Sequence, residues 1–134
     1  MYIFLASAAG NANVLVVTGT GANISGNATV TNNIIRSVST GISAAGSTQG
    51  TATAITKDIN VVSTVSTGEG VVLPTAVAGM TITITNTSAN SVNVYPASGA
   101  AINSLGTDAA FVQSSGATLQ YVAPTTTQWY TVGA

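Results

Sequence analysis

The sequence predicts an all-β fold, a small β-sandwich or jelly-roll-like barrel with an extended N-terminal β arm. Val, Ile, Thr and Tyr dominate the candidate strands, and Gly, Asn, Ser and Asp separate them. No stretch keeps the apolar spacing of three and four residues that is typical of a helix. We therefore expect a Gly/Asn/Thr-rich arm or oligomerisation segment over residues 1–50 and a β-sandwich domain over residues 51–134.

The expected arm contains few large side chains and many turn residues. A first strand is predicted over residues 2–5, because the alternative, a signal peptide, needs a positive side chain and a longer apolar run. Gly19, Thr20, Gly21 and Gly26 lack the spacing of a dinucleotide-binding loop and indicate turns. Residues 41–50 are rich in Gly, Ala and Ser, which predicts a flexible link or long loop.

Residues 51–134 alternate more regularly. Ile82 and Ile84 lie between threonines, so they are expected to share a buried face. Val92 and Val94 repeat this pattern after a turn at 86–90, which predicts a hairpin over residues 80–95. The same alternation recurs at Leu119 and Tyr121, and at Trp129 and Thr131 against Tyr130 and Val132. Three prolines fall at predicted strand ends, where a missing N–H costs little: Pro74, Pro96 and Pro124.

Ionisable side chains are scarce. The 134 residues include two cationic and three anionic side chains and neither His nor Cys. Acid–base catalysis and metal binding usually need several such groups, so we expect no enzyme, no catalytic, cofactor-binding or metal-ligating residue, and no cofactor. Two cations cannot neutralise a run of phosphates, which argues against a nucleic-acid partner. No segment approaches the ~20 apolar residues of a membrane span.

The charged residues are interpreted as local structural devices. Lys57 and Asp58 predict a polar strand edge, Glu69 a hairpin tip and Asp108 a turn. A calcium site built from Asp58, Glu69 and Asp108 is the alternative, but the three are dispersed along the chain. Three matches to the glycosylation pattern begin at Asn23, Asn27 and Asn86, and turn residues bonded to nearby backbone are the preferred interpretation.

The larger aromatic residues have two interpretations. They are expected to form the core of the sandwich, because the alternation around them is that of an interior strand. An exposed aromatic platform for a sugar or a partner is the alternative. The residues concerned are Tyr95, Phe111, Tyr121, Trp129 and Tyr130.

Low charge and a modest core point to assembly. A small domain built on Val, Ala and Ile buries limited apolar area, and a chain without Cys or a metal site has oligomerisation as its remaining source of stability. We therefore expect a homo-oligomer; the preference for a homotrimer is by analogy.

Six short sequence segments in the second part of the chain resemble a β module of tailed-bacteriophage (cyanophage-like) virion proteins. They lie at residues 54–62, 70–74, 78–86, 93–99, 101–105 and 127–130. Such modules occur in capsid decoration (cement) proteins and in tail or head fibre proteins. The resemblance implies a non-catalytic virion component. It assigns no binding residue in this chain, because the six segments correspond to strands and turns and not to a binding site.

Two functions follow as expectations. The first is a viral structural protein, a capsid decoration protein on the outer capsid surface, which binds and stabilises the major capsid protein lattice while its arm adds a strand to a neighbour. The second is a tail or head fibre or knob protein that contacts a host surface receptor. A secreted surface or filament subunit is a third interpretation, and the weak match of the N-terminus to a signal peptide argues against the export that it requires.

Overall fold

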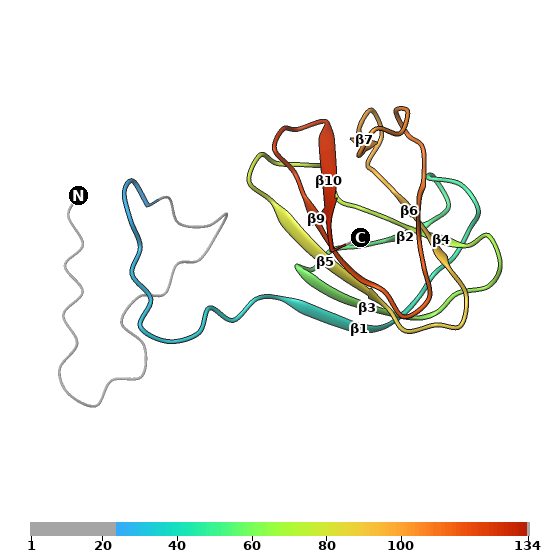
Figure 1. Ribbon diagram of the computed structural model, residues 1–134, viewed down its shortest axis with the longest axis horizontal. Coiled ribbons are helices and arrows are strands. Elements are labelled where there is room, and N and C mark those ends of the chain that lie inside the picture. Colours follow the sequence, from blue (N-terminus) through green and yellow to red (C-terminus); the bar gives the residue numbers. More distant parts are fainter. Residues whose placement is uncertain (1–23, 134) are drawn as a thin grey trace. The chain divides into compact units, whose positions relative to one another are not determined.

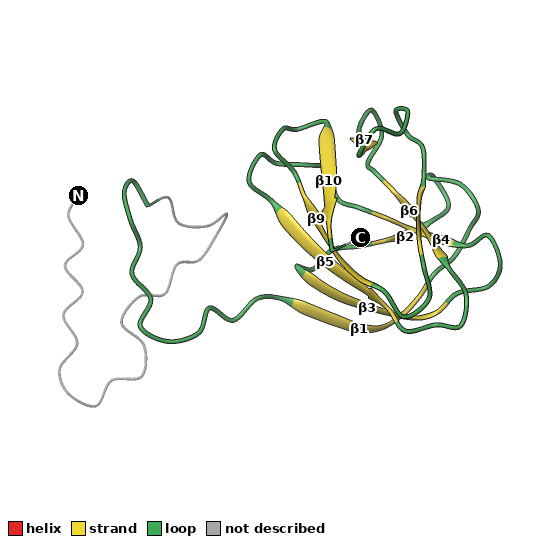
Figure 2. Ribbon diagram, viewed as in Figure 1, coloured by secondary structure: helices red, strands yellow, loops and turns green. Residues whose placement is uncertain are grey.

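The computed structural model describes residues 24–133, and its contacts divide the chain into two units, Met1–Ile34 and Ile35–Ala134. All assigned strands lie in the second unit, and residues 24–133 contain no helix (Figure 2). The strands are β1 (Val38–Ser43), β2 (Thr53–Ala54), β3 (Ile59–Thr64), β4 (Gly70–Val72), β5 (Thr81–Asn86), β6 (Val92–Tyr95), β7 (Ala101–Ile102), β8 (Phe111–Gln113), β9 (Thr118–Val122) and β10 (Gln128–Val132). The all-β prediction is confirmed.

The first six strands wind like a solenoid. They alternate between a six-stranded sheet, ordered β1-β3-β5-β9-β10-β7, and a four-stranded sheet, ordered β2-β4-β6-β8 (Figure 1). Within each sheet the successive strands of this winding pair in parallel. The expected β-sandwich or jelly-roll-like barrel is therefore wrong in its connectivity, because β1 to β6 stack in parallel within each sheet, whereas those folds are built from antiparallel neighbours.

The predicted hairpin over residues 80–95 is also wrong. β5 and β6 belong to different sheets, and the chain crosses between them through a turn built on Asn86. The Asn86 amide donates to the carbonyl of Asn90 (2.9 Å), and its Oδ1 accepts from the backbone N–H of Ser88 (3.1 Å). Alternation with period two is common to hairpins and to solenoid turns, so the sequence pattern alone did not separate the two.

The winding ends where antiparallel strands take over. β9 pairs antiparallel with β5 in the six-stranded sheet, and β8 pairs antiparallel with β6 in the four-stranded sheet. These C-terminal strands end the parallel stacking in both sheets. β10 then pairs antiparallel with β9, and β7 adds in parallel to β10. At the start of the winding, β1 is an edge strand of the six-stranded sheet and β2 is an edge strand of the four-stranded sheet.

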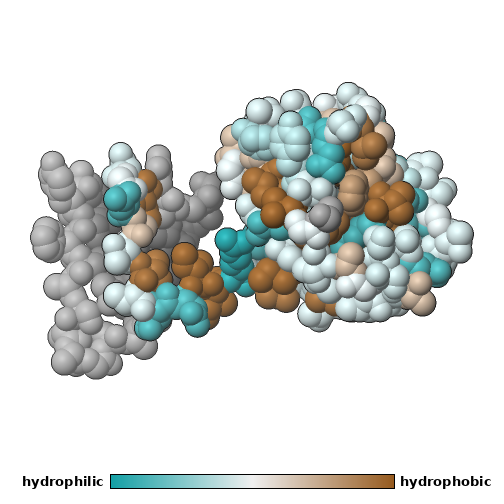
Figure 3. All heavy atoms as spheres, viewed as in Figure 1, coloured by the Kyte–Doolittle hydropathy of each residue, from teal (hydrophilic) through white to brown (hydrophobic). Residues whose placement is uncertain are grey.

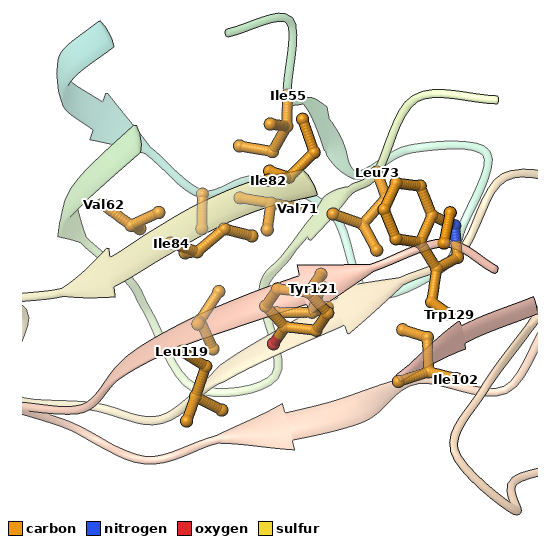
Figure 4. Packing of buried hydrophobic residues seen from close by; sticks show 14 of the residues in the cluster. Ile55, Val62, Val71, Leu73, Ile82, Ile84, Ile102, Leu119, Tyr121 and Trp129 are labelled. Atoms are coloured by element: carbon orange, nitrogen blue, oxygen red, sulfur yellow. The ribbon is translucent and has the colours of Figure 1, made fainter. Parts of the chain in front are cut away.

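The core lies between the two sheets. As predicted, Ile82 and Ile84 point inward from β5, and Leu119 and Tyr121 do so from β9 (Figure 4). Trp129 is completely buried and lies near Leu73 and Ile102 in the same interior. Full burial of one large apolar side chain stabilises the fold by about 1.5–3 kcal/mol. The three prolines follow the ends of β4, β6 and β9, as predicted.

The boundary between units differs from the one expected at residues 50/51. Residues 38–43 form β1, which pairs with β3, and Ala44 is buried in the core, so much of the expected link at 41–50 is part of the folded unit. Gly41 interrupts the register of β1 with a positive φ of 69°, which glycine adopts without strain. The strand predicted over 2–5 and the turn predicted at 19–21 lie outside the described residues.

Candidate functional site

The pair Lys57–Asp58 precedes β3 and joins it to the start of β1. The Asp58 carboxylate accepts from both the backbone N–H (3.1 Å) and the hydroxyl (2.9 Å) of Ser37, while the Asp58 N–H donates to the Ser37 hydroxyl (3.0 Å). This reciprocal arrangement fixes the register of β1 against β3. Asp58 therefore has a structural role just before the strand. The predicted polar strand edge is wrong, because β3 is an interior strand that pairs with β1 on one side and β5 on the other.

The other two carboxylates also bond to turns. Glu69 accepts from the backbone N–H of Ser66 (2.7 Å), and the turn it closes leads from one sheet to the other, so the predicted hairpin tip is instead a crossover. Asp108 lies in a turn, as predicted, with a positive φ of 63°. The Gln49 amide (3.0 Å) and the Gly99 N–H (2.7 Å) donate to Asp108 and hold the pKa of its carboxyl below the usual range.

These carboxylates do not meet. Within residues 24–133 no group of three His, Cys, Asp or Glu side chains is placed to hold a metal ion, so the alternative of a calcium site receives no support.

A buried polar network lies where β5, β8 and β9 approach the end of the core. The Tyr121 hydroxyl donates to Oε1 of Gln113 (2.9 Å), and the Gln113 amide donates to the carbonyls of Ile84 (2.8 Å) and Ala117 (3.0 Å). Gln113 and Tyr121 are completely buried, and burial raises the pKa of the Tyr121 phenol well above its usual range. The network ties the two sheets together, because β8 belongs to one and β9 to the other.

Sequence reasoning did not identify Gln113 as a buried residue. Its position two residues after Phe111, on the same side of a short strand, was the available signal. Glutamine is usually exposed, so this position was not expected in the core.

The glycosylation-like pattern at Asn86 is structural. Asn86 is completely buried, and its amide also donates to the carbonyl of Ser114 (3.2 Å). A side chain so enclosed is not available to a modifying enzyme, in agreement with the preferred interpretation. Asn27 is exposed, and Asn23 lies outside the described residues.

The aromatic residues divide between the core and the surface. Trp129 and Tyr121 are completely buried, and Phe111 is partly buried with its ring edge-on to Tyr121, so the core interpretation is confirmed for these three. Tyr95 is half-buried and donates to the carbonyl of Ser47 (2.8 Å). Tyr130 is 51% exposed, so the expectation that it belongs to the core is wrong. Residues 129 and 130 point to opposite faces of β10, and only one of them can point inward.

Within residues 24–133, two buried side-chain polar atoms have no hydrogen-bond partner: the indole nitrogen of Trp129 and Oδ1 of Asn60. Asn60 nevertheless donates through its amide to the carbonyl of Lys57 (2.7 Å). Neither Trp129 nor Asn60 lines the groove described next.

An open groove of about 390 Å³ lies between the start of β1 and the segment that precedes β5. It is lined by Arg36, Asp58, Val77, Gly79, Met80 and Thr81. Asp58 already bonds to Ser37, which leaves the Arg36 guanidinium as the polar group best placed to meet a ligand here. One cation in an open groove does not define a binding chemistry.

Comparisons with protein-family models, with curated proteins and with solved structures gave no match. Among residues 24–133 there is no helix of the length and hydropathy that a membrane crossing requires.

Proposed function

We propose that the chain is a structural protein of a tailed-bacteriophage virion, a capsid decoration (cement) protein on the outer capsid surface. It binds the major capsid protein lattice and other copies of itself, as a homotrimer by analogy, and stabilises the lattice without a catalytic step. The resemblance of residues 52–132 to virion β modules motivates the proposal.

The observation that carries it is the contrast between the two units. In the folded unit, interlocked strands enclose one continuous core. In the first unit, the described residues 24–34 are exposed throughout and include Ile24, Val30 and Ile34, which are 61%, 52% and 73% exposed. The structure assigns no strand to residues 24–34, so their backbone groups are free of a sheet, and exposed apolar residues on such an uncharged segment favour docking onto another protein by strand addition.

The mechanism is multivalent attachment. Each protomer contributes a small area with few charges, so a single contact is weak. Linking several such contacts in one oligomer raises the overall affinity by 10²–10⁴ without any new contact, provided that the sites can be reached together. A protein of this kind resists outward pressure on a capsid because many contacts must break at once.

The test measures binding to parent capsids from which the protein has been removed. The triple variant Ile24→Asn, Val30→Asn, Ile34→Asn keeps the length of the segment and removes its apolar side chains, and we expect it to bind much less. Val112→Asn, at a position 59% exposed in the folded unit and outside the groove, is the control and is expected to bind normally. If the triple variant binds the capsids as well as the control does, residues 24–34 have no role in attachment.

A fibre or knob protein that contacts a host surface receptor is the second candidate. The exposed Tyr130 on an uncharged strand surface favours it, because aromatic rings stack on sugars. Counting copies per particle separates the two functions. Hundreds of copies support decoration, whereas a few tens or fewer support a fibre.

A further inference from the structure

The six-stranded sheet ends at β1, which is long for an edge strand. Within residues 24–133, β1 pairs with β3 on one side and with no strand on the other (Figure 1). It has six residues, whereas the other three edge strands, β2, β7 and β8, have two or three. Shortness, charged residues and proline normally protect an edge from further pairing. β1 has none of these, since its sequence VSTGIS contains neither a charge nor a proline.

The backbone of Val38 points away from β3. Ser37 faces β3, because its carbonyl accepts from the N–H of Ile59 (3.0 Å) and its N–H donates to the Asp58 carboxylate (3.1 Å). Successive residues of a strand direct their N–H and C=O groups to opposite sides, so those of Val38 lie on the free edge. The positive φ of Gly41 and the register shifts around it divide the free edge into short parts. Such an edge accepts a short extended peptide through its backbone.

Residues 27–31 have the properties of that peptide. The run Asn-Ala-Thr-Val-Thr alternates polar and apolar side chains, which is the pattern of a half-buried strand, and it contains no charge, Gly or Pro. The structure assigns neither a strand nor a β-bridge to residues 24–34, and hydrophobic side chains lie exposed along them (Figure 3). A five-residue strand outside any sheet matches the short free edge of β1.

We propose that residues 27–31 of one copy, the donor segment, add as a strand to the free edge of β1 in a second copy. The inference rests on the proposed self-assembly and names the two surfaces that serve it. The donor segment and β1 are both uncharged, so their contact desolvates no ion and brings no like charges together. Arg36, which lines the open groove, lies outside both segments.

The contact joins two different surfaces, and this determines the kind of oligomer. When a segment of one copy binds an edge of the next, the copies associate head to tail, and such an arrangement closes into a ring if the rotation between copies permits it. A ring of three serves the proposed homotrimer, whereas contact of one surface with itself gives a two-fold pair. Residues 32–37 connect the donor segment to β1 and span roughly 20 Å at most, so the β1 edges of neighbouring copies lie near a shared axis.

The first experiment blocks each surface separately with proline, which removes a backbone N–H. Val38→Pro blocks the edge and Thr29→Pro blocks the donor segment, with Asn33→Pro as the control outside residues 27–31. By sedimentation velocity between about 1 and 100 μM, we expect the two blocked variants to show a dissociation constant at least about tenfold above that of the wild type. Thr29→Pro lies in a segment without strands, so its result does not depend on the tolerance of β1 to proline.

The matched control for the edge is Val112→Pro on β8. Val112 is 59% exposed, close to the 54% of Val38. Its partner Asn93 donates its N–H to the carbonyl of Glu69 (3.1 Å), toward β4, so the pair is not hydrogen-bonded and the Val112 N–H also lies on a free edge. Both controls should keep the mass of the wild type, and circular dichroism confirms that each variant is folded.

The second experiment mixes the two blocked variants. Val38→Pro keeps its donor segment and Thr29→Pro keeps its edge, so the mixture should form a 1:1 dimer that neither variant forms alone. The chain has no Cys, so adding Thr31→Cys to the first variant and Thr40→Cys to the second gives one thiol in each. A thiol-specific cross-linker of about 10 Å then captures even a weak dimer.

Two results would overturn the proposal. One is a wild-type chain that stays monomeric at about 100 μM, and the other is a mixture that gives no more cross-linked dimer than each variant alone. The second result is expected if one surface binds itself or if the donor segment pairs with β1 of its own chain. Rings that form through this contact but do not bind capsids would refute decoration and leave the contact intact. Monomers that bind capsids would support decoration and refute the contact.

Discussion

Removal of the Tyr121 hydroxyl should destabilise the folded unit by a predictable amount. In Tyr121→Phe the ring stays in place, but Oε1 of Gln113 loses its donor (2.9 Å in the wild type) in a completely buried site. Leaving one buried polar atom without a partner costs about 1–3 kcal/mol. With a urea m-value of about 1–3 kcal/mol/M, the unfolding midpoint should fall by roughly 1 M.

The assay is urea unfolding followed by the fluorescence of Trp129, the single Trp of the chain, which is completely buried. Tyr130→Phe is the matched control, because it removes the same hydroxyl from a ring that is 51% exposed, and its midpoint should stay within the error of the wild type. Measurements at two protein concentrations separate unfolding from dissociation. A Tyr121→Phe midpoint equal to that of the control would refute the claim that this network joins the two sheets.

Three further predictions concern stability. Burial raises the pKa of Tyr121, so as the pH rises the unfolded state loses this proton before the folded state does. The free energy of unfolding should therefore fall above about pH 10 by up to about 1.4 kcal/mol per pH unit. Urea titrations at alkaline pH should show a smaller fall per pH unit for Tyr121→Phe than for the wild type. The pKa of Asp108 is lowered in the folded state, so its stabilising contribution is lost as the pH falls below about 4. Below that pH the free energy of unfolding of Asp108→Asn should depend less on pH than that of the wild type. Gly70→Ala would place Cβ 2.5 Å from the carbonyl oxygen of Asn93 between β4 and β6, whereas Gly50→Ala meets nothing within 4 Å, so the melting temperature should drop sharply only for the first.

The alternation of side chains made the inward residues predictable. Ile82, Ile84, Leu119, Tyr121 and Trp129 all point into the core as expected, because a strand buries every second residue whatever its neighbours are. Which strands become neighbours was not predictable in the same way. A hairpin and a solenoid turn present the same local pattern, and the choice between them depends on the long-range pairing of β1, β3 and β5.

The roles of the polar residues were predictable only where they lie in turns. Asp108 occupies a turn with positive φ, which Asp tolerates better than most residues, and its position after Gly106 and Thr107 indicated this. Gln113 gave no comparable signal, because its burial depends on a tyrosine hydroxyl and two carbonyls that come from elsewhere in the chain. The alignment of Thr83, Gln120 and Val132 in one row across β5, β9 and β10 also becomes visible only once the register between strands is known.

The most direct test of an assembly held together by apolar and backbone contacts is the mass of the isolated oligomer, measured by light scattering in low salt and in about 1 M salt. Screening at high salt weakens only contacts between charges, and the chain has five charged side chains. We therefore predict the same mass in both conditions, or a slightly larger one in high salt. Complete dissociation at about 1 M salt would show that the few charges control the interface and would contradict this account.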